Sequence, residues 1–156
     1  PHARSGYDRL WHTEFAASRP IGWHATGDVG QFDDDGRLWI GGRLRELITA
    51  PDGPLPPVGF EQACEALPGV ELAAVVGVGP PGAQELVAVL QTSVRRPRAA
   101  ELHRVDAVRG ATGRHVAAVF EVPALPVDRR HNSKIDRSRV AAWADRALAG
   151  GRLGRW

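Results

Sequence analysis

Apolar residues in this chain gather in short runs of strand length, separated by turns rich in glycine and proline. The runs at 71–78, 85–92 and 115–122 are rich in valine, which is typical of strands buried within a sheet. Nearer the N-terminus, "VGQFD" and "RLWIGG" flank the acidic turn "DDDG", and this arrangement predicts a β-hairpin. The segment "RELITA" that follows is expected to form a further short strand.

Helical patterns alternate with these strands. Residues 58–67 predict a short amphipathic helix, and residues 98–110 predict a polar one. A last helix is expected to begin at Asp136, as its N-cap, and to end at the glycine pair 150–151. The prolines of "PDGPLPP" are expected to forbid regular structure between hairpin and first helix. The order of elements predicts a small α+β or α/β domain.

Composition narrows the class of protein. Fractions of 43% hydrophobic and 24% charged residues are those of a soluble globular chain, and no apolar run approaches the roughly 20 residues that span a bilayer. The net charge is only +2, so nucleic-acid binding is not expected. A single cysteine, Cys64, is expected in the core and favours a reducing, cytoplasmic location. The first 22 residues lack clear periodicity and are interpreted as a connector from a preceding body.

Several motifs are rejected on their context. "GVGPPG" at 77–82 has the spacing of a dinucleotide fingerprint, but two of its positions are prolines without an N–H, so it is interpreted as a loop between strands. The histidines have no metal-ligand spacing, and no metal site is predicted. They are His2, His12, His24, His103, His115 and His131. Trp39 and Trp143 are expected to pack among apolar neighbours.

Two residues have candidate chemistry of their own. Asp28, in the glycine-flanked "TGDVG", could accept hydrogen bonds from the vicinal hydroxyls of a ribose, although a turn-forming aspartate explains these residues alone at least as well. Lys134 is the only lysine of the chain, against 19 arginines. A compact ammonium on a flexible stem fits between small anionic oxygens where a planar guanidinium does not, which favours a functional lysine over an ordinary surface one.

Ordered motifs over about residues 23–140 resemble the C-terminal end of the acyl-adenylate-forming enzymes, the superfamily of acyl-CoA synthetases, luciferases and peptide-synthetase adenylation domains. They are T-G-D, D-G-x-L, G-R, P-x-x-x-E, and a lysine before I-x-R. Within this superfamily, the motifs W-H-x-x-G-D and V-D-x-R-H-N-x-K-I most resemble those of the bacterial β-lactone synthetases. The resemblance implies activation of a β-hydroxy fatty acid with ATP and Mg²⁺, then closure of the acyl-adenylate to a β-lactone.

The resemblance also implies roles for individual residues. Asp28 would hold the ribose hydroxyls of the nucleotide, and Arg43 would stand near the same ribose and phosphate. Arg45 occupies the place of the hinge about which the small domain swings. Glu61 matches the acid before that domain's first helix, where a structural role is expected. Lys134 matches the catalytic lysine of adenylation.

The implied organisation has three parts. Residues 1–43 would be the C-terminal remnant of the large adenylation domain, residues 44–149 the mobile lid with a central mixed sheet flanked by helices, and residues 150–156 a tail. The lid would work with a missing N-terminal adenylation domain, which holds most of the ATP and Mg²⁺ contacts, and with other enzymes of the lipid pathway. This chain alone is expected to be inactive.

Departures from the pattern bear on the acceptor. Ser133 stands where most of the superfamily has glycine, which favours lactone closure, and the proline-rich segment after the hinge lacks the lysine-glycine pattern of CoA-forming relatives. Two alternatives stay open: a fragment of an acyl-CoA or acyl-carrier ligase, and a non-catalytic binding or regulatory domain that retains the fold.

Overall fold

The computed structural model describes residues 25–127, 134–154 and 156. These residues fall into two compact units, of which the first ends at Arg45 and the second begins at Glu46. Within the described ranges, no helix combines the length and the apolar character needed to cross a bilayer. Of the residues weighed above, His2, His12, His24, His131 and Ser133 lie outside the described part of the chain.

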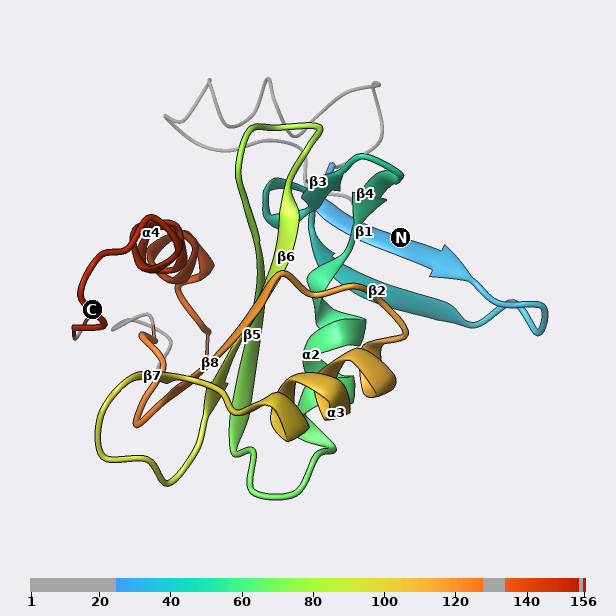
Figure 1. Ribbon diagram of the computed structural model, residues 1–156. Coiled ribbons are helices and arrows are strands. Elements are labelled where there is room, and N and C mark those ends of the chain that lie inside the picture. The colour runs from blue at the N-terminus through green and yellow to red at the C-terminus, as the bar shows by residue number, and fades with distance from the viewer. Residues whose placement is uncertain (1–24, 128–133, 155) are drawn as a thin grey trace. The chain divides into compact units, whose positions relative to one another are not determined.

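The first unit contains the expected hairpin. Strand β1 (Asp28–Phe32) pairs antiparallel with β2 (Leu38–Arg43), with a bulge between Val29 and Gly30 (Figure 1). The turn is organised by Asp33, whose carboxylate accepts hydrogen bonds from the backbone N–H groups of Asp35 and Arg37. The hairpin prediction is confirmed.

Trp39 departs from the expected packing. Its side chain is 59% exposed in the chain, and its Nε1 donates to Asp33 Oδ2 at 2.8 Å. Leu38 and Ile40, on the opposite face of the strand, are 56% and 54% exposed, so neither face of β2 is buried within the described part of the chain. Trp39 lies directly across from Gln31. An indole has one N–H donor on an otherwise apolar ring, and here the carboxylate of Asp33 in the hairpin turn accepts its hydrogen bond.

The second unit opens with a 3₁₀ turn, η1 (Leu44–Glu46), which straddles the boundary, and a small ribbon of β3 (Ile48–Ala50) paired with β4 (Gly53–Leu55). The expectation that the prolines here exclude regular structure is wrong at β4. Pro54 is exposed and lies across from Thr49 in a ribbon of only two strands. A proline is tolerated there because its missing N–H can face away from the partner strand.

The main sheet of the second unit has the order β5-β6-β8-β7. Strands β5 (Leu72–Val78) and β6 (Glu85–Gln91) form an antiparallel pair joined by the loop that contains "GPPG", so this motif is a connection between strands, as predicted. Strand β8 (Ala118–Val122) runs parallel to β6, and β7 (Arg98–Ala99) runs antiparallel to β8. The sheet is therefore mixed, and the α+β prediction is confirmed.

Helices cover both faces of this sheet (Figure 1). Helices α2 (Pro57–Glu65) and α3 (Leu102–Thr112) lie on one face, and α4 (Arg137–Leu148) lies on the other. Alternate residues of each strand point to opposite faces, so neighbours such as Val75 and Val76 enter different cores. Cys64 is fully buried in the core under α2, as expected.

The predicted polar helix at 98–110 begins later than expected. Arg98 and Ala99 form β7, in which the Arg98 guanidinium donates to Glu121 Oε2 at 2.8 Å. Glu121 is 4% exposed, so its charge needs this partner. The helix then continues through Gly110 to Thr112 and ends at Gly113, which has the left-handed backbone of a C-cap (φ 63°).

The residues interpreted as a tail pack against the second core. Trp143 on α4 lies edge to face with Phe120 of β8, and its Nε1 donates to the Gly154 carbonyl at 2.9 Å. Trp156 lies beside Trp143 and donates from its Nε1 to the Ala124 carbonyl at 2.7 Å. Leu153 and Trp156 thus pack against the same core as α4.

Gly77 marks a crowded point on β5. A Cβ at this position would lie 2.8 Å from Ile48 Cγ2 and 2.7 Å from Gln84 Oε1. Both neighbours are held in place, since Ile48 is buried and Gln84 Oε1 accepts from the backbone N–H and hydroxyl of Thr49. The absence of a side chain lets β3 approach the main sheet closely.

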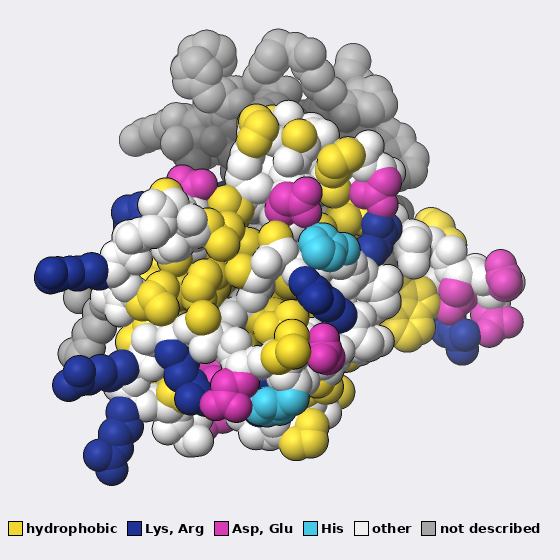
Figure 2. All heavy atoms as spheres, in the orientation of Figure 1, with side chains coloured by type: hydrophobic (Ala, Val, Ile, Leu, Met, Phe, Trp, Pro, Cys, Tyr) yellow, Lys and Arg dark blue, Asp and Glu magenta, His cyan; other side chains and the backbone are white. Residues whose placement is uncertain are grey.

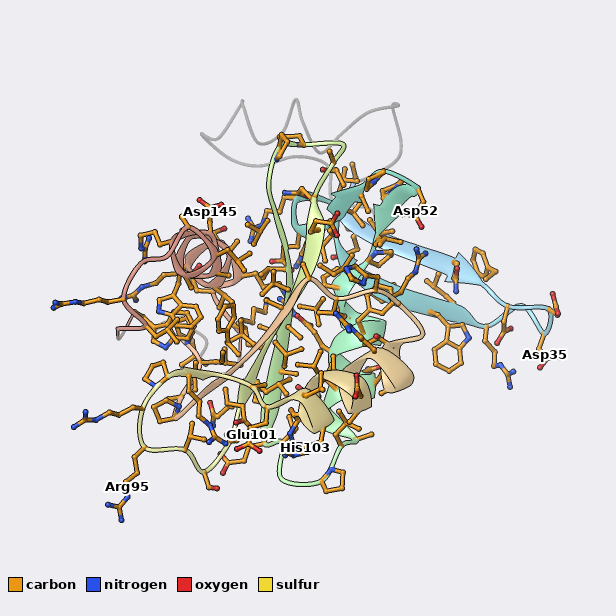
Figure 3. All side chains as sticks on the ribbon, viewed as in Figure 1. Asp35, Asp52, Arg95, Glu101, His103 and Asp145 are labelled. Carbon is orange, nitrogen blue, oxygen red and sulfur yellow. The ribbon has the colours of Figure 1, made fainter. Side chains whose placement is uncertain are left out.

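Charge on the face shown in Figure 2 is of both signs, with basic side chains projecting along one edge and acidic ones among the other residues. The labelled charged residues of the second unit lie at its surface in Figure 3: Arg95 projects from the loop between β6 and β7, and Asp145 lies on the outer side of α4. Glu101 and His103 are neighbours at the start of α3, with 3.5 Å between Glu101 Oε2 and His103 Nδ1.

Candidate functional site

The T-G-D segment of the first unit is held against the end of β2. Asp28 and Arg43 are directly opposed in the hairpin register, and Arg43 Nη1 lies 3.1 Å from Asp28 Oδ1. The same guanidinium donates to the Thr26 carbonyl at 2.9 Å, while the Thr26 hydroxyl accepts from the Asp28 backbone N–H at 3.2 Å. The two residues predicted to bind the nucleotide are therefore brought together, and their side chains remain partly exposed.

Gly27 shapes this turn. Its φ of 73° lies in the left-handed region, and its carbonyl accepts from the Leu44 N–H at 2.7 Å. A residue with a side chain would be strained there. The glycine of T-G-D thus lets the chain turn sharply into β1 and presents Asp28 beside Arg43.

Arg45 is the last residue of the first unit and lies at the centre of the 3₁₀ turn η1. Its side chain is exposed. Glu46, the next residue, begins the second unit. The two compact bodies therefore meet in sequence at the residue that the resemblance assigns as a hinge.

Lys134 lies in the second unit, three residues before the first turn of α4, and its side chain is exposed. The backbone beside it is anchored at two points. Ile135 forms an isolated bridge with Val127, and the Asp136 N–H donates to the Pro126 carbonyl at 2.9 Å. The ammonium group therefore extends from a backbone that its neighbours hold.

Asp136 caps the helix that follows. Its Oδ1 accepts from the Arg139 backbone N–H at 3.1 Å, which satisfies one of the free donors in the first turn. The predicted N-cap is confirmed. The cap fixes where α4 begins, and so fixes how far before the helix Lys134 lies.

Arg137, the first residue of α4, joins three elements of the second unit. Its Nε and Nη2 donate to the two carboxylate oxygens of Glu61 on α2, at 2.8 and 2.5 Å. Its Nη1 donates to Glu46 Oε2 at 3.0 Å. The bond to Glu61 is bidentate, the geometry in which a guanidinium and a carboxylate bind most strongly. The hydrogen bond with Glu61, together with the charges of Glu61 and Glu46, raises the pKa of Arg137.

Glu61 lies inside α2 and not before it, which corrects the expected position. It is 5% exposed, and its Oε1 also accepts from the Val75 backbone N–H in β5 at 3.1 Å. A buried carboxylate is costly unless it is paired and hydrogen-bonded, and here both oxygens are satisfied. The contacts of Glu61 are with protein groups that hold α2, β5 and α4 together.

The sequence did not predict a role for Arg137, close to Lys134, or for Glu46, next to Arg45. The signal was present, because Arg137 is the arginine of the I-x-R pattern after Lys134. A pattern of letters does not show that this arginine turns inward to Glu61. Among the described residues, no group of three or more His, Cys, Asp or Glu side chains is arranged to hold a metal ion.

The chain is similar in sequence to several proteins of known name. It is 39% identical over 126 residues to an olefin beta-lactone synthetase of Xanthomonas campestris, covering 78% of this chain and 23% of that protein. It is 48% identical over 74 residues to a rat long-chain-fatty-acid–CoA ligase, covering 46% and 10% of the two chains. No protein-family model matches the sequence. The chain thus spans about a quarter of the length of the first of these relatives.

Solved structures agree with the sequence relatives. The amide bond synthetase McbA from Marinactinospora thermotolerans is 29% identical, with a TM-score of 0.72 over 90% of this chain and 28% of that one. The chain belongs to the AMP-forming ligases and corresponds to their C-terminal part. An ATP-bound MatB from Rhodopseudomonas palustris shares the fold of this ligase part, with a TM-score of 0.72, 23% identity, and coverage of 90% and 28%.

Proposed function

We propose that these residues form the mobile C-terminal lid of an ATP-dependent ligase that makes acyl-adenylates, together with the last hairpin of its large domain. The observation that carries the proposal is the 39% identity over 126 residues to an olefin beta-lactone synthetase. The only lysine of the chain supports it, because the Lys134 side chain is exposed just before α4, on a backbone that its neighbours anchor. Residues 44–149 would be the lid, and Arg45 its hinge.

In the proposed reaction, a carboxylate oxygen attacks the α-phosphorus of Mg·ATP and the bond to the β-phosphate breaks, so that pyrophosphate leaves. Lys134 would contact the carboxylate and α-phosphate oxygens and offset the negative charge that these groups bring together. Charge stabilisation of this kind is commonly worth about 3 kcal/mol. Asp28 would hold the ribose hydroxyls, and Arg43, already beside Asp28, would orient that carboxylate and face the phosphate.

The second step we propose is ring closure. The hydroxyl of a β-hydroxy fatty acid attacks the acyl carbon of the adenylate, loses its proton, and displaces AMP, which yields a β-lactone. The named activity of the Xanthomonas relative supports this choice. A thioester-forming ligase is the second candidate, since a rat fatty-acid–CoA ligase is 48% identical over a shorter segment.

The test uses a complete enzyme that carries these residues as its C-terminal part, assayed by ATP–pyrophosphate exchange with a β-hydroxy fatty acid. Lys134→Ala and Lys134→Arg should each lower the exchange rate by about 100-fold or more, with nearly unchanged ATP affinity. Wild-type exchange in the arginine variant would overturn the role of the ammonium.

Product analysis separates the two candidates. Lactone formed without CoA supports ring closure, whereas thioester formed only with CoA supports the second candidate. The 156-residue chain alone should not catalyse exchange, and exchange by it would contradict the assignment of half the site to another domain.

A further inference from the structure

The guanidinium of Arg137 is shared between two carboxylates from distant parts of the second unit. Glu61 comes from the middle of α2, and Glu46 from the turn that begins the unit. Because Glu61 also accepts from the Val75 N–H, Arg137 is connected to the main sheet as well as to both elements. The first residue of α4 is thereby tied to a sheet strand, a helix and the start of the unit.

This tie acts on the backbone that carries Lys134. Only two residues separate Lys134 from Arg137, and both make main-chain contacts to the segment at 126–127. Ile135 also packs against the core beside α4, and Asp136 caps that helix. Arg137 adds a different connection, because it alone of these three residues joins α4 to α2 and to the start of the unit by side-chain hydrogen bonds that the structure shows. The torsions of the lysine stem already spread the position of the ammonium, and any movement of the Cα adds to that spread. A fixed Cα therefore places the charge more accurately.

We infer that Arg137 is a positioning residue for Lys134, and that its bond to Glu46 carries the position of Lys134 to the residue next to the hinge. The inference rests on the proposed function of Lys134. Glu61 and Glu46 engage three of the five guanidinium N–H donors of Arg137, so the role we assign to it is exerted through Lys134 and not by contact with substrate. When Arg45 turns, the lysine would then move with the start of the unit as one piece.

A purely structural ion pair makes a different prediction. If Arg137 only stabilises the fold, its loss lowers the amount of folded enzyme, and its effect adds to that of any change at Lys134. If Arg137 acts through Lys134, its loss matters only while the lysine is present. Two residues that act as one unit give strongly non-additive effects in a double-mutant cycle.

The experiment compares Arg137→Gln, Lys134→Ala and the double variant in the complete enzyme, by ATP–pyrophosphate exchange, with a melting curve for each. Arg137→Gln should lower the turnover of exchange by about 10- to 100-fold with little change in the KM for ATP. The double variant should be no slower than Lys134→Ala. Arg137→Lys should recover part of the loss, because an ammonium can still reach one carboxylate. Arg139 is an exposed arginine two residues further along α4, so Arg139→Gln is the matched control, and its exchange rate should equal that of wild type.

Each outcome is decisive. Wild-type turnover in a folded Arg137→Gln enzyme, or additive losses in the double variant, would overturn the inference while leaving the function of Lys134 intact. Wild-type exchange in Lys134→Ala would overturn the proposed function itself. If Arg137→Gln does not fold, Glu46→Gln replaces it in the same cycle, because that change keeps the bidentate bond to Glu61 and weakens the link from Arg137 to the start of the unit.

Discussion

The rings of Trp143 and Trp156 lie 4.9 Å apart between centroids, with their planes inclined at 50°. Each indole N–H has a backbone acceptor, Gly154 for Trp143 and Ala124 for Trp156. The last residue of the chain is therefore part of the second core, and not a loose end.

Replacing Trp156 with alanine should destabilise the second unit. The loss removes aromatic contact with Trp143 and the bond to Ala124, and for a half-buried ring we expect about 2 kcal/mol from the free energy of unfolding. Trp156→Phe keeps a ring without the donor and should lose about 1 kcal/mol. Urea unfolding of the 156-residue chain measures both, and an alanine variant as stable as wild type would contradict the packing role.

Glutamate 61 should matter to stability far more than Glu65, one turn later on α2. Each accepts from a backbone N–H of β5, Val75 for Glu61 and Ala73 for Glu65, so glutamine at either position keeps an acceptor. Glu61→Gln also removes the negative charge and the second oxygen that bind Arg137, and breaking a buried ion pair in this way should cost about 2 to 4 kcal/mol. Glu65→Gln is the control. Equal losses in the two variants, measured by urea unfolding, would show that the backbone contact dominates.

The hairpin turn should titrate at unusually low pH. The Trp39 indole, then the Arg37 side chain and backbone, lower the pKa of Asp33 to about 2. Because the pKa is lowered on folding, the ionised carboxylate stabilises the turn above its ordinary range near pH 4, and this contribution is lost as the pH falls towards 2. Carbon-detected NMR of the Asp33 carboxyl checks the midpoint. Trp39→Phe should move it upward, and an unmoved midpoint would exclude the indole as the main cause.

Cysteine 64 should be unreactive in the folded chain. Burial, and then the charges of Glu61 and Glu65, raise the pKa of its thiol from an ordinary 9.0 to about 11. At pH 8, a disulfide reagent should label it only after urea unfolds the chain. The unfolded thiol ionises first, so folded stability should fall as the pH rises from about 9 towards 11. Rapid labelling without denaturant would contradict the buried placement.

Local rules predicted much of this structure because they act over a few neighbouring residues. The valine-rich strands, the acidic hairpin turn and the Asp136 cap follow from spacing and side-chain type alone. Strand β4 was missed because its proline argues against a strand, although its partner β3 lies directly before it in the chain. The strand pairing of Arg98 was missed because its partner, Glu121, lies 23 positions further along. For the site, the opposed register of Asp28 and Arg43 follows from the hairpin, whereas the bond from Arg137 to Glu61 joins residues 76 positions apart.

The bare backbone at Gly77 has a consequence for the start of the second unit. A methyl group there would collide with Ile48 and with Gln84, whose oxygen is already committed to Thr49. The side chains of Ile48 and Gln84 would have to shift, and a shift of β3 with Ile48 would displace Glu46, two residues before it. The absence of a side chain at Gly77 on β5 thus helps to set the position from which the Glu46 carboxylate binds Arg137.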